Sequence, residues 1–170
     1  RKKILKFTEI GNFAIKKKLE LIELDSFEND DIYKKIVSLN IDIFVVVAFK
    51  ILPEKYISIP RFGSINLHAS FLPKYRGAAP IQWALFNGEE ITGVSVFQIA
   101  KKVDTGKIIY QKKVDIDKSD NFESLSVKLS NLGAEILIKA LNNIEDGEAN
   151  LLDQDNNLST RAPKISKNML

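Results

Sequence analysis

Residues 41–49 read IDIFVVVAF, a run that is almost entirely apolar and rich in β-branched side chains. This pattern is typical of a strand that is buried on both faces of a sheet. Apolar patterning predicts further strands at Gly63–Ala69, Val94–Ile99 and Lys107–Val114. The sequence therefore predicts a sheet in which the strand at residues 41–49 is covered on both sides.

Helical periodicity alternates with these strands. The predicted helices cover Thr8–Lys18, a segment capped by Asp30 or Asp31 that runs to Leu39, Ala79–Phe86 and Asp120–Ile144. A short strand is predicted at Glu20–Leu24. Asp120 and Glu123 have the spacing of a capping box at the start of the last helix. The helix carries an apolar stripe that consists of Leu125, Leu129, Leu132, Ile136 and Ala140. The alternation predicts a doubly wound α/β fold with a mostly parallel sheet, whose ligand crevice lies beyond the carboxyl ends of the strands.

Composition narrows the chemistry that the chain can support. Its 170 residues include one histidine and no cysteine, so disulfides, thiolate metal sites and histidine-rich metal sites are excluded. No run is long and apolar enough for a membrane span, and no secretory signal is visible, so we expect a cytoplasmic protein without a membrane partner. Lysine and arginine number 25 against 22 acidic residues, an excess too small to predict a nucleic-acid partner by itself.

Polar residues follow the predicted strands at the edge where a crevice is expected. Asn66 and His68 are two apart on one strand, so their side chains face the same space. Asp104 lies in a Val-Asp-Thr-Gly turn after the next strand. Each feature also has a plain structural interpretation, since a lone histidine is often a hydrogen-bonded structural residue and Asp-Thr-Gly suits a turn. The residues alone indicate an Asn/His/Asp group at the open end of an α/β sheet.

Taken together, these segments resemble a known family. The run SINLHASFLPKYRGAAPIQWA at residues 64–84, with DTGKII at 104–109, VVAFKILP at 46–53 and APKI at 162–165, is similar to folate-dependent formyltransferases, and most of all to those that act on methionyl-tRNA. The resemblance implies a Rossmann-like fold and formyl transfer from 10-formyltetrahydrofolate to an amine without a metal. It also implies catalytic roles for Asn66, His68 and Asp104.

The same resemblance implies the binding residues. The folate is expected to contact two loops, formed by Phe49, Ile51, Leu52, Pro53, Ser70, Phe71, Leu72 and Pro73. The initiator methionyl-tRNA is expected to contact Arg1, Lys74 and Arg76, although the last two could equally fix their loop by internal hydrogen bonds. Residues 1–170 would form part of one catalytic domain of a monomer, without the family's first strand and its C-terminal β-barrel domain.

Two other functions remain open from the sequence. One is a sugar-nucleotide N-formyltransferase or a formyltetrahydrofolate hydrolase-type domain, both of which share Asn-x-His and a downstream Asp. The other is a non-catalytic module that binds folate or RNA. The Arg76–Gln82 run and Ala162–Ile165 favour the enzyme that acts on tRNA.

Overall fold

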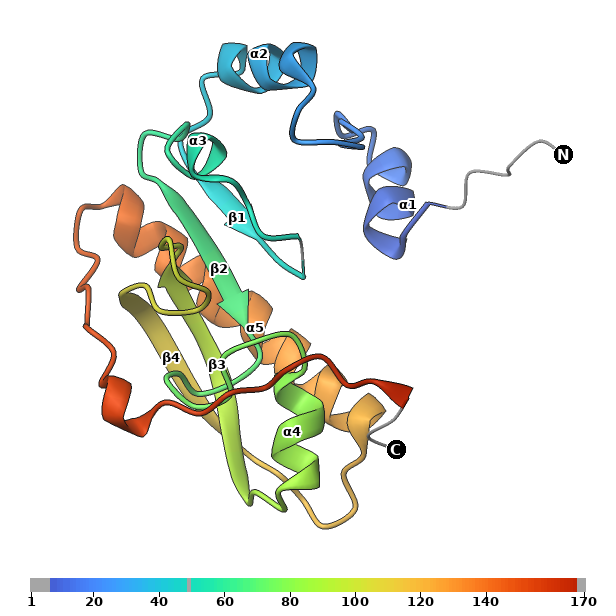
Figure 1. Ribbon diagram of the computed structural model, residues 1–170, viewed down its shortest axis with the longest axis vertical. Coiled ribbons are helices and arrows are strands. Elements are labelled where there is room, and N and C mark those ends of the chain that lie inside the picture. Colours follow the sequence, from blue (N-terminus) through green and yellow to red (C-terminus); the bar gives the residue numbers. More distant parts are fainter. Residues whose placement is uncertain (1–6, 49, 168–170) are drawn as a thin grey trace, which may run out of the picture. The chain divides into compact units, whose positions relative to one another are not determined.

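The computed structural model describes residues 7–48 and 50–167, and the chain divides into two compact units, Arg1–Asn40 and Ile41–Leu170 (Figure 1). The first unit contains α1 (Glu9–Lys16) and α2 (Asp30–Ser38). The Asn29 side chain accepts hydrogen bonds from two backbone N–H groups at the start of α2. The cap is therefore Asn29, and the prediction of Asp30 or Asp31 was wrong by one or two residues.

The predicted strand at Glu20–Leu24 is not formed. Its apolar alternation suits a strand, but a strand needs a neighbour to satisfy its backbone N–H and C=O groups. Within the described part of the first unit no other segment is extended and paired, so the alternation alone does not produce a strand.

The second unit contains a four-stranded sheet in the order β1 (Phe44–Val46), β2 (Ser64–His68), β3 (Ile91–Gln98) and β4 (Ile108–Asp115). The pair β1–β2 is parallel, whereas β2–β3 and β3–β4 are antiparallel. The α/β fold class is confirmed, but the described sheet is mixed and not mostly parallel. The connection 99–107 is shorter than the dozen or so residues that a parallel crossover requires, so β4 must run antiparallel to β3.

Helix α5 (Phe122–Glu145) packs along one face of this sheet (Figure 1). The buried core between them consists of Ile65, Val94, Val96, Ile109, Leu125, Leu129, Ile136 and Ala140. Every second residue of β3 points to this core, and the residues between them point to the opposite face. On that opposite face Leu72, Phe97 and Ile108 form a second cluster, so the loop that follows β2 covers it.

Two short helices and one 3-10 turn complete the unit: α3 (Glu54–Ile57), α4 (Pro80–Phe86) and η1 (Asn156–Leu158). Helix α4 was predicted, and Pro80 occupies its first position. The chain after α5 runs back across the unit, pairing Leu152 with Ile108 and Arg161 with Arg76. This C-terminal segment, residues 147–167, therefore lies beside the loop that follows β2.

Candidate functional site

Strand β2 carries the first two residues of the candidate site. Asn66 and His68 are separated by one residue on this strand, so both side chains project from the same side. The His68 side chain is buried, and Asn66 is half-buried. The Asn66 Oδ1 atom is shielded from solvent and has no hydrogen-bond partner among the residues that the structure describes. An unsatisfied buried acceptor is uncommon in proteins and is a natural contact point for a ligand.

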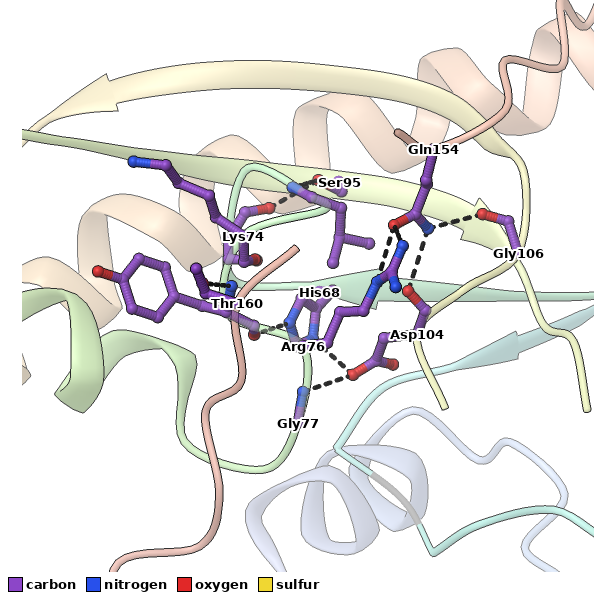
Figure 2. Close-up of polar contacts among 12 residues, drawn as sticks. His68, Lys74, Arg76, Gly77, Ser95, Asp104, Gly106, Gln154 and Thr160 are labelled. Carbon is purple, nitrogen blue, oxygen red and sulfur yellow. Dashed lines mark hydrogen bonds and ion pairs between the residues drawn. The ribbon is translucent and has the colours of Figure 1, made fainter. Parts of the chain in front are cut away.

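The His68 ring lies between the loop that follows β2 and the turn between β3 and β4 (Figure 2). Its Nε2 lies 2.9 Å from the carbonyl oxygen of Tyr75. Because a carbonyl can only accept, Nε2 must carry the proton, which leaves Nδ1 as the basic nitrogen of the neutral ring. Nδ1 lies 3.9 Å from Oδ2 of Asp104, beyond hydrogen-bond distance. The edge of the ring also meets Phe97 at 6.4 Å between centroids.

Asp104 is fixed in the turn between β3 and β4. Its backbone is in the left-handed region with φ 54°, and its carboxylate is buried. Oδ2 accepts a hydrogen bond of 2.8 Å from the backbone N–H of Gly77 (Figure 2). Gly106 must be small, because a Cβ there would lie 1.7 Å from the carbonyl oxygen of Gln98. The turn thus presents the carboxylate to His68 in a rigid frame.

Gln154, in the C-terminal segment, connects the turn that carries Asp104 to Arg76 in the loop that follows β2. Its Nε2 donates to the carbonyls of Asp104 at 3.0 Å and Gly106 at 2.7 Å. Its Oε1 accepts from Arg76 Nη2 at 2.6 Å and Nε at 3.1 Å (Figure 2). Gln154 was not predicted from the sequence, since it lies 50 positions from Asp104 in a polar stretch without a local motif.

The two loop cations take different positions. Arg76 is half-buried and also donates to Asn156 at 3.0 Å, so its guanidinium is held by internal bonds. Burial lowers the pKa of Arg76 from its ordinary value, and the negative charge of Asp104 partly opposes that shift. Lys74 is exposed and lies 3.4 Å from a carboxylate oxygen of Glu89. Arg76 therefore helps to fix the loop, the alternative that the sequence left open.

The loop 70–73, which follows β2, is fixed by polar contacts to the sheet. The Ser95 hydroxyl donates to the Ser70 carbonyl at 2.6 Å and accepts from the Leu72 N–H at 3.0 Å. Gln111 donates to the Leu72 carbonyl at 2.8 Å. Ser70 and Leu72 are buried, whereas Phe71 and Pro73 are half-buried.

The other predicted folate loop lies between β1 and α3. Ile51 is 76% exposed, and Leu52 and Pro53 are half-buried. This exposure excludes simple core packing for Ile51. Phe49 and Arg1 lie outside the described residues, so the structure does not place these two predicted contacts.

Across residues 7–48 and 50–167, no three His, Cys, Asp or Glu side chains gather where they could hold a metal ion. In the same part of the chain, no helix has both the length and the apolar character needed to cross a bilayer.

Comparison with known proteins identifies relatives over almost the whole chain. It is 46% identical over 168 residues to a methionyl-tRNA formyltransferase of Thermodesulfovibrio yellowstonii, a match that covers 98% of this chain and 54% of that protein. A methionyl-tRNA formyltransferase of Ehrlichia chaffeensis is 45% identical over 146 residues, covering 85% of this chain and 48% of that protein. The chain thus spans about half the length of the curated relatives it matches.

Solved structures share the fold at lower sequence identity. HypX from Aquifex aeolicus, solved with tetrahydrofolic acid, superposes with a TM-score of 0.74 at 19% identity, covering 92% of this chain and 27% of that one. The formyltransferase PseJ from Anoxybacillus kamchatkensis, solved with a formamido sugar nucleotide and tetrahydrofolate, gives a TM-score of 0.70 at 20% identity, covering 91% and 79%. The model of the formyl transferase family matches residues 4–141. This match, with the relatives above, shows that the chain belongs to the formyl transferase family.

Proposed function

We propose that this chain carries the catalytic site of an enzyme that transfers a formyl group from 10-formyltetrahydrofolate to the amino group of methionyl-tRNA. The observation that carries the proposal is the arrangement of Asn66, His68 and Asp104 around the end of β2. The names of relatives at 46% and 45% identity support the choice of methionyl-tRNA as acceptor.

The reaction needs a carbonyl addition followed by an elimination. The amine nitrogen of the acceptor attacks the formyl carbon, which forms a new C–N bond and a tetrahedral oxyanion. Collapse of this intermediate breaks the bond between the formyl carbon and N10 of the folate. The proton lost by the amine ends on N10, so the products are the formylated amine and tetrahydrofolate. The site must therefore stabilise an oxyanion and move one proton.

Asn66 is suited to the first task. Its side-chain NH₂ donates to the developing oxyanion, and its unsatisfied Oδ1 accepts an N–H of the attacking amine. Both groups sit on a strand inside the sheet, so neither has to reorganise as charge develops.

His68 and Asp104 are suited to the second task. Since Nε2 of His68 is bound to the Tyr75 carbonyl, Nδ1 receives the proton from the amine. The resulting imidazolium lies 3.9 Å from the Asp104 carboxylate, which stabilises it. Asp104 acts through charge in this proposal, because the hydrogen bond that orients the ring is donated by His68 Nε2 to the Tyr75 carbonyl.

The folate is assigned to the two loops beside the site. Ile51, Leu52, Pro53 and Phe71 offer exposed or half-buried apolar surface for its ring system, and Phe49 is assigned to the same site from the sequence alone. The buried residues Ser70 and Leu72, with Pro73, shape the loop and present backbone groups. Tetrahydrofolate in the solved structures of HypX and PseJ supports a folate donor here.

The test is an acceptor panel with the full-length protein and 10-formyltetrahydrofolate. Methionyl-tRNA, an amino-sugar nucleotide and water are offered separately, and release of tetrahydrofolate and formylation of the acceptor are both measured. We expect formylation of methionyl-tRNA. Formylation of the sugar nucleotide alone, release of formate without an amine acceptor, or folate binding without turnover would each contradict the proposal.

A further inference from the structure

A cleft of about 860 Å³ opens beside the candidate site, between the loop that follows β2, the turn between β3 and β4, and the C-terminal segment. Four of its lining residues are cations: Arg76, Lys101, Lys102 and Arg161. Among the described residues that line it, none carries a carboxylate. The remaining lining residues include Ser159 and Thr160, whose hydroxyls add neutral donors.

The positive charge of this cleft is only partly balanced by its surroundings. Lys101 lies 3.8 Å from Glu54, and both side chains are largely exposed, so this pair is weak. Arg76 is held in place by Gln154 and Asn156, which are neutral. Lys102 and Arg161 are exposed residues of the cleft wall. The cleft is therefore suited to an anion with more than one charge.

The cleft also adjoins the residues proposed for catalysis. Its lining residue Gly77 donates to the Asp104 carboxylate at 2.8 Å, and its lining residues Val103 and Thr105 flank Asp104 in the chain. A ligand in this cleft thus lies next to the reacting groups. Methionyl-tRNA, the acceptor of the proposed reaction, carries negatively charged phosphates close to its amine, because the aminoacyl ester is at the end of a phosphodiester chain.

We propose that this cleft binds phosphates of the single-stranded acceptor end of the tRNA, with Lys102 and Arg161 as the main contacts. The inference rests on the proposed function and adds the site at which the RNA is held. Arg76 contributes charge and also keeps the wall rigid through its bonds to the C-terminal segment. Neither Lys102 nor Arg161 was among the tRNA contacts expected from the sequence.

The test uses the full-length protein with Lys102→Ala and Arg161→Ala combined. If each exposed phosphate contact contributes about threefold, KM for methionyl-tRNA rises about tenfold. The kcat stays within about twofold, because neither side chain touches the reacting atoms. The slope of log kcat/KM against log salt concentration becomes shallower by about 1.4, because each of the two lost single-strand phosphate contacts accounts for about 0.7 of that slope.

Lys118→Ala combined with Lys139→Ala is the matched control, since it removes the same charge from exposed positions away from the cleft. The control should leave KM and the salt dependence unchanged. The inference would be overturned if the cleft variant kept the wild-type KM for methionyl-tRNA, or if its KM rose for the folate donor and not for the tRNA. In either case, formylation of methionyl-tRNA by the wild type would still uphold the proposed function. A wild type that does not formylate methionyl-tRNA would remove both.

Discussion

The hydrogen bond between His68 Nε2 and the Tyr75 carbonyl decides which ring nitrogen is available for proton transfer. With Nε2 engaged at 2.9 Å, any proton exchanged with a substrate passes through Nδ1, the atom that faces Asp104. Tyr75, whose carbonyl accepts this bond, has a backbone φ of 59° in the loop after β2. A backbone carbonyl cannot be removed by substitution, so the roles of the site are best separated at the side chains of Asn66, Asp104 and Gln154.

Replacing Asn66 with Ala should lower kcat for formyl transfer by about a hundredfold or more, the usual effect of losing one oxyanion donor. Tetrahydrofolate affinity should stay within a few-fold of wild type, because the proposed contacts of Asn66 form only around the reacting carbon. Rapid-quench kinetics and equilibrium folate binding separate the two quantities. An equal loss in binding and kcat would make Asn66 a folate-binding residue.

Gln154 should act as a positioning residue for Asp104. In Gln154→Glu the bonds accepted from Arg76 are kept, but the two donors to the Asp104 and Gly106 carbonyls are lost. We expect kcat to fall by about tenfold, as misplaced catalytic groups commonly cause, while KM for the folate donor changes little. Gln154→Ala should be no more active. A Glu variant with wild-type kcat would show that the donors do not position Asp104.

The sequence predicts those site residues that lie close together because of local backbone geometry. The alternation of a strand is sufficient to place Asn66 and His68 on one side of β2. It cannot predict Gln154, which reaches Asp104 across 50 positions of chain, or the assignment of Tyr75 as the partner of His68. These contacts depend on how the C-terminal segment and the loop fold back onto the sheet.

At the scale of elements, the site is assembled where the loop after β2 meets the C-terminal segment. Arg76 N–H donates to the Thr160 carbonyl at 2.9 Å, and Ala162 N–H donates to the Arg76 carbonyl at 2.7 Å. Tyr75 and Ala162 are buried together with Ala84 of α4. The close approach of the two segments holds Gly77, which in turn binds Asp104.

Gly77→Ala should separate these two segments. Gly77 has φ 129°, and a Cβ there would lie 2.5 Å from the Ala162 carbonyl oxygen, so the substitution should cost about 3 kcal/mol of unfolding free energy. Gly147→Ala is the control, because its φ of 71° is also positive but its Cβ meets nothing within 4 Å. It should cost about 1 kcal/mol. Equal losses in urea unfolding would mean that the segments are not tightly apposed.

The start of α5 offers a test by pH. Hydrogen bonds from Lys128 at 2.6 Å and from the Ser124 hydroxyl at 2.7 Å lower the pKa of Asp120 from 3.8 to about 2. A lowered pKa stabilises the folded state above pH 3.8, and that contribution is lost as pH falls toward 2. The stability difference between wild type and Asp120→Asn should therefore shrink across this window, as measured by denaturant unfolding.

Lys128→Met provides the control for that prediction, because Lys128 is the main cause of the lowered pKa of Asp120. In a protein that already carries Lys128→Met, the stability difference caused by Asp120→Asn should depend much less on pH between pH 4 and 2. A pH dependence that persists unchanged without Lys128 would contradict this account of the helix start.

Elements with strong periodicity were predicted well from the sequence. Of the five residues in the predicted apolar stripe of α5, Leu132 is half-buried and the other four are buried. The cap was misplaced, since Asn121 and Ser124 form the capping box in place of Asp120 and Glu123. Asp120 is instead held by Lys128, a contact that the capping pattern does not include. Apolar periodicity does not give strand direction, which depends instead on the length of connections such as residues 99–107.

At the scale of the whole molecule, the second unit contains the candidate site and the basic cleft. Its sheet places Asn66 and His68, the turn between β3 and β4 supplies Asp104, and the C-terminal segment joins them. The chain spans about half the length of its curated relatives, so the proposed catalysis has to be tested in the full-length protein. The resemblance read from residues 64–84 identified the family, which the match over residues 4–141 confirms.

The most direct test is single-turnover formyl transfer from 10-formyltetrahydrofolate to methionyl-tRNA by the full-length protein and its His68→Ala variant. We predict that the wild type forms formylmethionyl-tRNA and that the variant is slower by about a hundredfold or more while still binding tetrahydrofolate. A wild type that transfers no formyl group to methionyl-tRNA, or a variant that keeps more than about a tenth of the rate, would contradict the account.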